Sequence, residues 1–181
     1  LSMRLYILSR TMSRLSSLPR MSAQRRALSL GGTDLEFTDD EAVEFLRRSG
    51  IDGASSQLDV VQRAGGWAAA LAILADHYDP SRAQGGTAPG SEFVLSDFID
   101  HEVLARLPEP HVTLLSACAV LDSFDAEFAE SLTGDPQAEQ HLRELEGTSH
   151  LITSLSERWL KMHALLREHL LDRLAREDPE R

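Results

Sequence analysis

A histidine at a predicted strand-to-helix corner is the residue of this sequence best placed for chemistry. His163 follows a short apolar segment, residues 159–162, and opens an amphipathic helical pattern. The positions that recur with helical spacing commit one face to a core; they are Leu165, Leu166, His169, Leu170 and Leu174. The first backbone N–H groups of a helix have no partner within it, and the helix dipole favours negative charge there. The sequence therefore predicts that His163 lies where an anion can bind.

Other reactive residues give little support for catalysis or metal binding. The seven histidines are scattered, and no pair has zinc-ligand spacing together with a third ligand. His169 is expected to be a core or interface residue, and Cys118, within an apolar run, a buried structural thiol rather than a nucleophile. A charged cluster on one predicted helix is more simply a solvated face than a metal site; it comprises Asp97, Asp100, His101 and Glu102.

Charge is distributed unevenly along the chain. Residues 1–33 hold six arginines and no acid, whereas the remaining 148 residues hold 12 basic and 29 acidic groups. This acidic body predicts no direct nucleic-acid binding, and no apolar run approaches the ~20 residues that a membrane helix needs. A single cysteine excludes an internal disulfide framework and fits a cytoplasmic location. The Arg- and Ser-rich start leaves an organellar transit peptide as the alternative.

Most of the chain is predicted to be helical. Thr38, followed three residues later by Glu41, makes a capping box that starts one helix. Ser55 or Ser56 is expected to cap a second helix, which Gly65 and its neighbouring glycine break. Further helices are expected at residues 67–78, 93–107, 111–120, 125–132 and 136–145.

Short strands are predicted near both ends of the chain. Residues 4–9 indicate a buried strand, and residues 27–30 a further short one. Residues 151–155 and 158–162 predict a hairpin after the helices, which is typical of the wing of a winged-helix domain. The fold class is therefore mainly α, a helical lid domain plus a winged-helix domain with a small two-stranded wing.

The order and spacing of these elements resemble a known family. The chain is similar to the large ATP-binding LuxR-family regulators related to the maltose-regulon activator, which are ATPases of the STAND class with numerous domains. The segments that carry the resemblance are residues 7–10, 34–38, 41–42, 66–71, 93–98, 102–104, 142–145 and 159–170.

The resemblance implies a fragment, because the phosphate-binding motif GxxxxGK[ST] does not occur in the sequence. Residues 1–34 would be the end of a P-loop ATPase domain, residues 35–80 its helical lid, residues 81–90 a linker and residues 91–177 the winged-helix domain. The P-loop domain would be a partner in cis, and the regulatory repeats and the DNA-binding end would lie elsewhere.

The resemblance also implies which residues sense a nucleotide. Arg10 takes the place of a sensor arginine for the terminal phosphate, with a solvated loop arginine as the alternative. His163 resembles the histidine of a Met-His-Asp motif that contacts the β-phosphate of ADP, although Ala164 replaces the acid; a packed histidine is the alternative. Gly66 and Trp67 take the place of a turn near the adenine, unless Trp67 fills the lid's own core.

The expected function is the nucleotide-sensing, interdomain switch of an ATP-dependent transcriptional regulator. ATP or ADP would be the cofactor of the longer protein, and this chain alone is not expected to hydrolyse ATP. A DNA-binding winged helix is the first alternative, but residues 135–146 carry four acids against one arginine. A helical protein-interaction module, which could self-associate, is the second.

Overall fold

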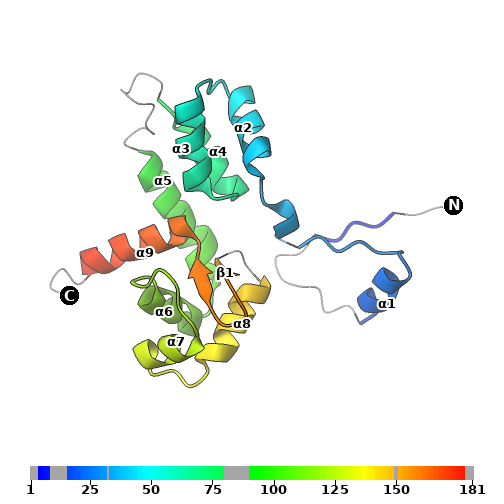
Figure 1. Cartoon of the computed structure of the whole chain (residues 1–181), viewed down its shortest axis with the longest axis vertical. Coiled ribbons are helices and arrows are strands. Elements are labelled where there is room, and N and C mark those ends of the chain that lie inside the picture. Colours follow the sequence, from blue (N-terminus) through cyan, green and yellow to red (C-terminus); the bar gives the residue numbers. More distant parts are fainter. Residues whose placement is uncertain (1–3, 9–15, 32, 80–89, 149–150, 178–181) are drawn as a thin grey trace.

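The computed structural model describes residues 4–8, 16–31, 33–79, 90–148 and 151–177. These residues form a mainly helical fold with a small antiparallel sheet, as the sequence predicts. Figure 1 shows a helical lid above a winged-helix unit, with the N-terminal part of the chain extending away from both. That N-terminal part contains the short helices α1 (Leu18–Ala23) and η1 (Thr33–Leu35).

The lid consists of α2 (Asp39–Arg48), α3 (Ala54–Ala64) and α4 (Ala68–Asp76). The predicted capping box is present, because the Thr38 hydroxyl accepts a hydrogen bond from the Glu41 N–H and the Glu41 carboxylate accepts one from the Thr38 N–H. The hydrogen bond from the Thr38 N–H, followed by one that the Thr38 hydroxyl donates to the same carboxylate, lowers the pKa of Glu41. Gly65 ends α3 in the left-handed conformation, which glycine adopts without steric cost.

A single helical stretch connects the lid to the winged-helix unit. It begins as α5 (Ser91–Phe98), which packs on α4, and continues as the π-helix η2 (Ile99–Val103) and the 3₁₀-helix η3 (Leu104–Arg106). The apolar pattern predicted one helix over residues 93–107 with Phe93 facing the core. The structure instead leaves Phe93 exposed and buries Leu95 and Ile99.

The winged-helix unit contains α6 (Glu109–Cys118), α7 (Ala126–Thr133) and α8 (Ala138–Thr148), followed by β1 (Ile152–Ser154), β2 (Leu160–Met162) and α9 (Ala164–Glu177). The wing is antiparallel and pairs Ile152 with Met162 and Ser154 with Leu160. An isolated bridge between Phe124 and Leu160 ties the segment before α7 to the same sheet.

The buried core runs through both units. Its members include Leu71 and Leu74 of the lid and Leu115, Leu166 and Leu170 of the winged-helix unit. Cys118 is fully buried at the end of α6, and burial raises the pKa of its thiol to about 12. It is therefore a structural cysteine, as expected.

Several local predictions were wrong. Residues 4–8 and 27–30 form no strand, and Leu5, Leu8 and Leu28 are exposed. A strand needs a neighbour for its backbone groups, and the described residues place none beside these segments. The N-cap of α3 was predicted at Ser55 or Ser56, two or three residues too late, because Gly53 is the N-cap and no serine side chain caps the helix.

Among the described residues, no helix has both the length and the apolar character that crossing a bilayer requires.

The capping box should contribute measurably to stability. Replacing Thr38 with alanine removes the side-chain acceptor for the first turn of α2, so we expect the free energy of unfolding to fall by about 1 kcal/mol. Urea denaturation measures this change. Ser55→Ala is the matched control, since Ser55 lies in the first turn of α3 without a capping role and its loss should stay within about 0.5 kcal/mol. Equal losses in the two variants would contradict the assignment.

A buried carboxylate joins α7 to the wing and should make stability depend on pH. Asp125 accepts hydrogen bonds from the Phe128 N–H at 2.9 Å and from Arg158 Nε at 2.6 Å. The Phe128 bond, followed by the Arg158 contact, lowers the pKa of Asp125 below its ordinary 3.8. This stabilisation is complete above pH 3.8 and is lost as the pH falls through the lowered pKa.

The test compares the free energy of unfolding of the native chain and of Asp125→Asn between about pH 2 and pH 6. The native advantage should shrink at the acidic end, because the amide of the variant does not titrate. Asp172→Asn, at an exposed position of α9, should parallel the native curve. A native advantage that stays constant across the range would show that the charge of Asp125 is irrelevant.

Candidate functional site

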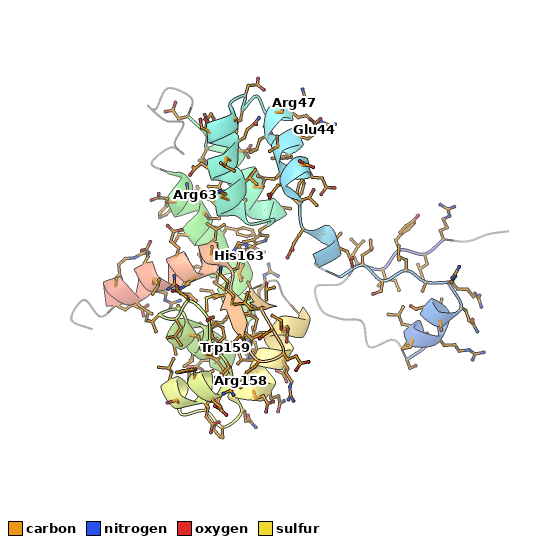
Figure 2. All side chains as sticks on the ribbon, in the orientation of Figure 1. Glu44, Arg47, Arg63, Arg158, Trp159 and His163 are labelled. Carbon is orange, nitrogen blue, oxygen red and sulfur yellow. The ribbon has the colours of Figure 1, made fainter. Side chains whose placement is uncertain are left out.

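His163 lies at the corner between β2 and α9, where the sequence placed it. Its backbone N–H donates to the Leu151 carbonyl at 2.9 Å, and its carbonyl accepts from the Arg167 N–H at 3.0 Å. The second bond is the first of α9, so His163 occupies the N-cap position rather than the first turn. Figure 2 shows the residue between the lid helices and the winged-helix unit, with its ring half-buried.

The glycine pair after α3 is the surface that the His163 ring meets. The His163 Nε2 atom is 3.4 Å from the Gly65 carbonyl oxygen, and a Cβ atom on Gly65 would lie 2.9 Å from that nitrogen. Gly66 accepts a hydrogen bond from the Phe37 N–H at 2.9 Å. Both glycines have positive φ, +55° and +82°. The turn therefore requires glycine for its backbone, and Gly65 also for the close approach of the histidine.

Trp67 completes the contact between lid and winged-helix unit. Its ring meets the His163 ring edge-on, with centroids 5.5 Å apart, and lies 5.7 Å from the Phe98 ring. It is half-buried, and its backbone is the N-cap of α4. The indole packs on Phe98 of α5 and also touches the candidate sensor histidine, and its place beside the adenine stays a prediction.

The structure thus brings Gly66, Trp67 and His163 together, although they are separated by nearly a hundred residues in sequence. Arg10, the fourth predicted site residue, lies outside the described residues. The sequence pointed to neither Gly65 nor Phe98 as members of the site. Gly65 could have been found from its glycine–glycine turn, whereas the contact of Phe98 with Trp67 depends on tertiary packing alone.

A second polar group lies deeper, between α9 and the α5–η2 stretch. His169 is 7% exposed; its Nδ1 atom is 3.1 Å from the Ser96 hydroxyl oxygen, and its Nε2 atom is 2.8 Å from an Asp100 carboxylate oxygen. Arg173 Nε donates to the Glu177 carboxylate at 2.8 Å, and this hydrogen bond raises the pKa of Arg173. His169 is therefore an interface histidine, as predicted.

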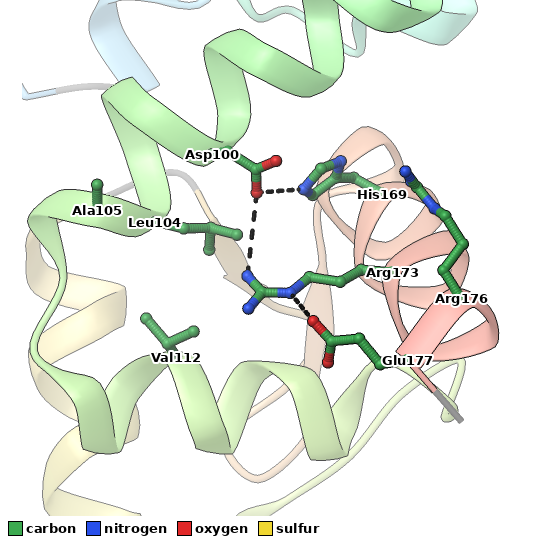
Figure 3. A pocket seen from close by; sticks show the side chains of 8 residues that line it. All are labelled: Asp100, Leu104, Ala105, Val112, His169, Arg173, Arg176 and Glu177. Carbon is green, nitrogen blue, oxygen red and sulfur yellow. Dashed lines mark hydrogen bonds and ion pairs between the residues drawn. The ribbon is translucent and has the colours of Figure 1, made fainter.

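An open cavity of about 550 Å³ adjoins this group (Figure 3). Leu104, Ala105 and Val112 form its apolar side, and Asp100, His169 and Arg173 face it from the other. Asp100 belongs to the cluster that was predicted to be a solvated face. Its carboxylate is partly exposed, as predicted, but it also binds the buried His169, which the sequence did not indicate. Neither this cavity nor a second one beside Ala164 and Arg167 is lined by Gly66, Trp67 or His163.

Comparison with known proteins agrees with the winged-helix geometry. Residues 100–181 match the family described as the MalT winged helix domain. Over almost its whole length, the chain is similar to part of the MalT regulators. It is 32% identical to the HTH-type transcriptional regulator MalT of Yersinia pestis (strain Pestoides F), in an alignment that covers 97% of the chain. The MalT proteins of Yersinia enterocolitica and Serratia proteamaculans are 31% and 29% identical over 93% of the chain.

The aligned region is a small part of these MalT proteins. The chain spans 21% of the Yersinia pestis protein and 20% of the other two. The similarity to this MalT-like region nevertheless extends beyond the matched winged helix domain into the lid, because it covers almost the whole chain. His163 lies within the winged-helix match, residues 100–181. The glycine turn and Trp67 lie before residue 100, in the part of the chain that the longer alignments add.

The contact between Gly65 and His163 can be tested by filling the space at Gly65. Gly65→Ala combines a left-handed backbone with a Cβ atom 2.9 Å from the ring, whereas Gly50→Ala has the left-handed backbone and nothing within 4 Å. We expect Gly50→Ala to cost about 1–2 kcal/mol of unfolding free energy, and Gly65→Ala to cost more.

The extra cost of Gly65→Ala should disappear in a His163→Ala background, which removes the ring that the new methyl group meets. Chemical denaturation of the two single variants and the double variant gives this coupling energy. The contact would be refuted if the two alanine substitutions were simply additive.

Proposed function

We propose that this chain is the nucleotide-sensing, interdomain switch region of a STAND-type transcriptional regulator. The observation that carries the proposal is the meeting of His163 of the winged-helix unit with the Gly65–Trp67 turn of the lid, 5.5 Å between the two rings. Two comparisons support the proposal: residues 100–181 match the MalT winged helix domain, and the similar proteins are named transcriptional regulators.

The residues present fit one side of a nucleotide site. The imidazole of His163 can donate a hydrogen bond, and the first N–H groups of α9 beside it favour a bound anion. The Trp67 ring contacts the same histidine and is flat, so that a base could pack against it. A phosphate cradle is absent from the sequence, so the proposal assigns it to a P-loop ATPase domain in cis, with ADP or ATP as the ligand.

The proposed switch depends on a difference in contact. A ligand shifts a conformational equilibrium only when it interacts differently with the two states. His163 would supply that difference by contacting the phosphate of ADP when lid and winged-helix unit are together. Without the contact, the two units separate and expose the apolar and aromatic surfaces around Trp67, through which the regulator would self-associate.

The proposal places DNA recognition outside this chain. Helix α8, which follows α7 in the winged-helix unit, carries Glu139, Glu144 and Glu146, and its Arg143 is paired with Glu139. An acidic helix repels the phosphate backbone of a duplex. The corresponding location would be the cytoplasm, where a transcriptional regulator meets its DNA.

Calorimetric titration with ADP and ATP tests the proposal. The isolated chain should bind neither nucleotide at micromolar concentration, and a protein in which a P-loop ATPase domain from a MalT relative precedes it should bind both. His163→Ala should then weaken ADP binding about tenfold, because a hydrogen bond to a charged group is lost, and should affect ATP binding less.

His101→Ala is the matched control, since its imidazole is exposed and pairs with Asp97 of its own helical stretch. It should leave both affinities unchanged. Micromolar binding or hydrolysis by the isolated chain would mean that the nucleotide site is elsewhere. An equal effect of His163→Ala on ADP and ATP would remove the basis of the switch.

A further inference from the structure

The helical stretch between lid and winged-helix unit changes its winding at one place. Residues Ser91–Phe98 are α-helical, Ile99–Val103 follow π-helical geometry and Leu104–Arg106 form a 3₁₀ turn. Short π and 3₁₀ segments have weaker hydrogen-bond geometry than an α-helix, and π segments often occur at functional sites or hinges. Bending of the stretch should therefore concentrate at residues 99–106.

The change in winding coincides with the boundary of the winged helix domain. Helix α5 packs on α4 and so moves with the lid. The match to the MalT winged helix domain begins at Asp100, the second residue of the π segment. The segment Ile99–Val103 therefore joins the helix that packs on the lid to the matched winged helix domain.

His169 holds the two sides of this boundary together. Its Nδ1 atom is 3.1 Å from the Ser96 hydroxyl on the lid side, and its Nε2 atom is 2.8 Å from the Asp100 carboxylate on the winged-helix side. A carboxylate can only accept, so Nε2 carries a hydrogen, and in the neutral ring the Ser96 hydroxyl donates to Nδ1. Asp100 thus orients the ring so that it can bind Ser96.

The surroundings allow this contact to open. His169 is 7% exposed, but the adjoining cavity of about 550 Å³ leaves the outer side of Asp100 unpacked. Arg173, whose Nη1 atom is 4.0 Å from Asp100, reinforces the carboxylate from the same helix α9. Figure 3 shows these groups on one side of the cavity and the apolar residues on the other.

We propose that the π segment Ile99–Val103 is the pivot between lid and winged-helix unit and that His169 is the clamp that sets its angle. The clamp consists of the hydrogen bond to Ser96 across the pivot and the bond to Asp100 that orients the imidazole. Its regulatory role rests on the proposed interdomain switch, but the pivot and clamp are properties of this chain alone. His169 acts through the relative position of the two units and touches no reacting group.

Distance measurements on the full 181-residue chain test the proposal without nucleotide. Spin labels on Gln62→Cys of α3 and Glu130→Cys of α7, both exposed positions, report the separation of the two units by pulsed electron resonance. The buried Cys118 should react slowly, because the pKa of its thiol is raised to about 12. We expect one narrow distance distribution for the chain with its clamp intact.

The clamp variants are Ser96→Ala and Asp100→Ala. Each should increase the population at a second distance about tenfold, since each removes one of the two hydrogen bonds of His169. The matched control is Asp97→Ala, which removes a carboxylate of α5 whose partner among the described residues is the exposed His101. The control should keep the narrow distribution.

Unchanged distances in both clamp variants would overturn the proposal, and so would an equal broadening in Asp97→Ala. If Asp100→Ala unfolds, as circular dichroism would reveal, Ser96→Ala decides alone, because it deletes a single oxygen atom. No nucleotide is present in these samples. A failed clamp therefore leaves the nucleotide titrations unaffected, and a failed nucleotide site leaves these distances unaffected.

Discussion

The close approach of His163 to the Gly65–Gly66 turn is the constraint on which the arrangement of lid and winged-helix unit depends. A side chain on Gly65 would meet the imidazole at 2.9 Å, and the backbone there is left-handed. The same turn binds Phe37 through Gly66 and starts α4 at Trp67. Residues 65–67 therefore bind the segment that precedes α2, begin α4 and contact His163 of the winged-helix unit.

A second tie between the two units has a different chemistry. The His163 contact is aromatic and half-exposed, whereas His169 is buried and has a hydrogen bond at each of its two ring nitrogens. A buried polar group without partners is costly, so the second tie is strong only while Ser96 and Asp100 are both in place. In the proposed switch, the first tie would be the contact that a ligand biases, and the second would set the angle between the units.

The N-terminal segment and the winged-helix unit differ in how far their apolar and charged side chains find partners within the described chain. Leu5, Tyr6 and Leu8 are 75%, 78% and 95% exposed in a segment flanked by arginines. Under the proposed function these residues would pair with the sheet of a P-loop ATPase domain, which would supply the neighbouring strand that they lack. The winged-helix unit, by contrast, satisfies its own charges: Arg158 binds Asp125, and Arg143 binds Glu139.

The sequence by itself determined the features that depend on neighbouring residues. Thr38 and Glu41 specified a capping box, the paired glycines ended α3, and the spacing of leucines predicted α9. Two short segments around a tight turn predicted the wing before it. Tertiary structure alone decided the π segment at Ile99–Val103, the Ser96–His169–Asp100 group and the meeting of Trp67 with His163. Local patterns carry hydrogen bonds across three or four residues, and the sequence can encode them directly. The histidine contacts join groups about 70 to 100 positions apart, and only the packing of the lid against the winged-helix unit brings them within bonding distance.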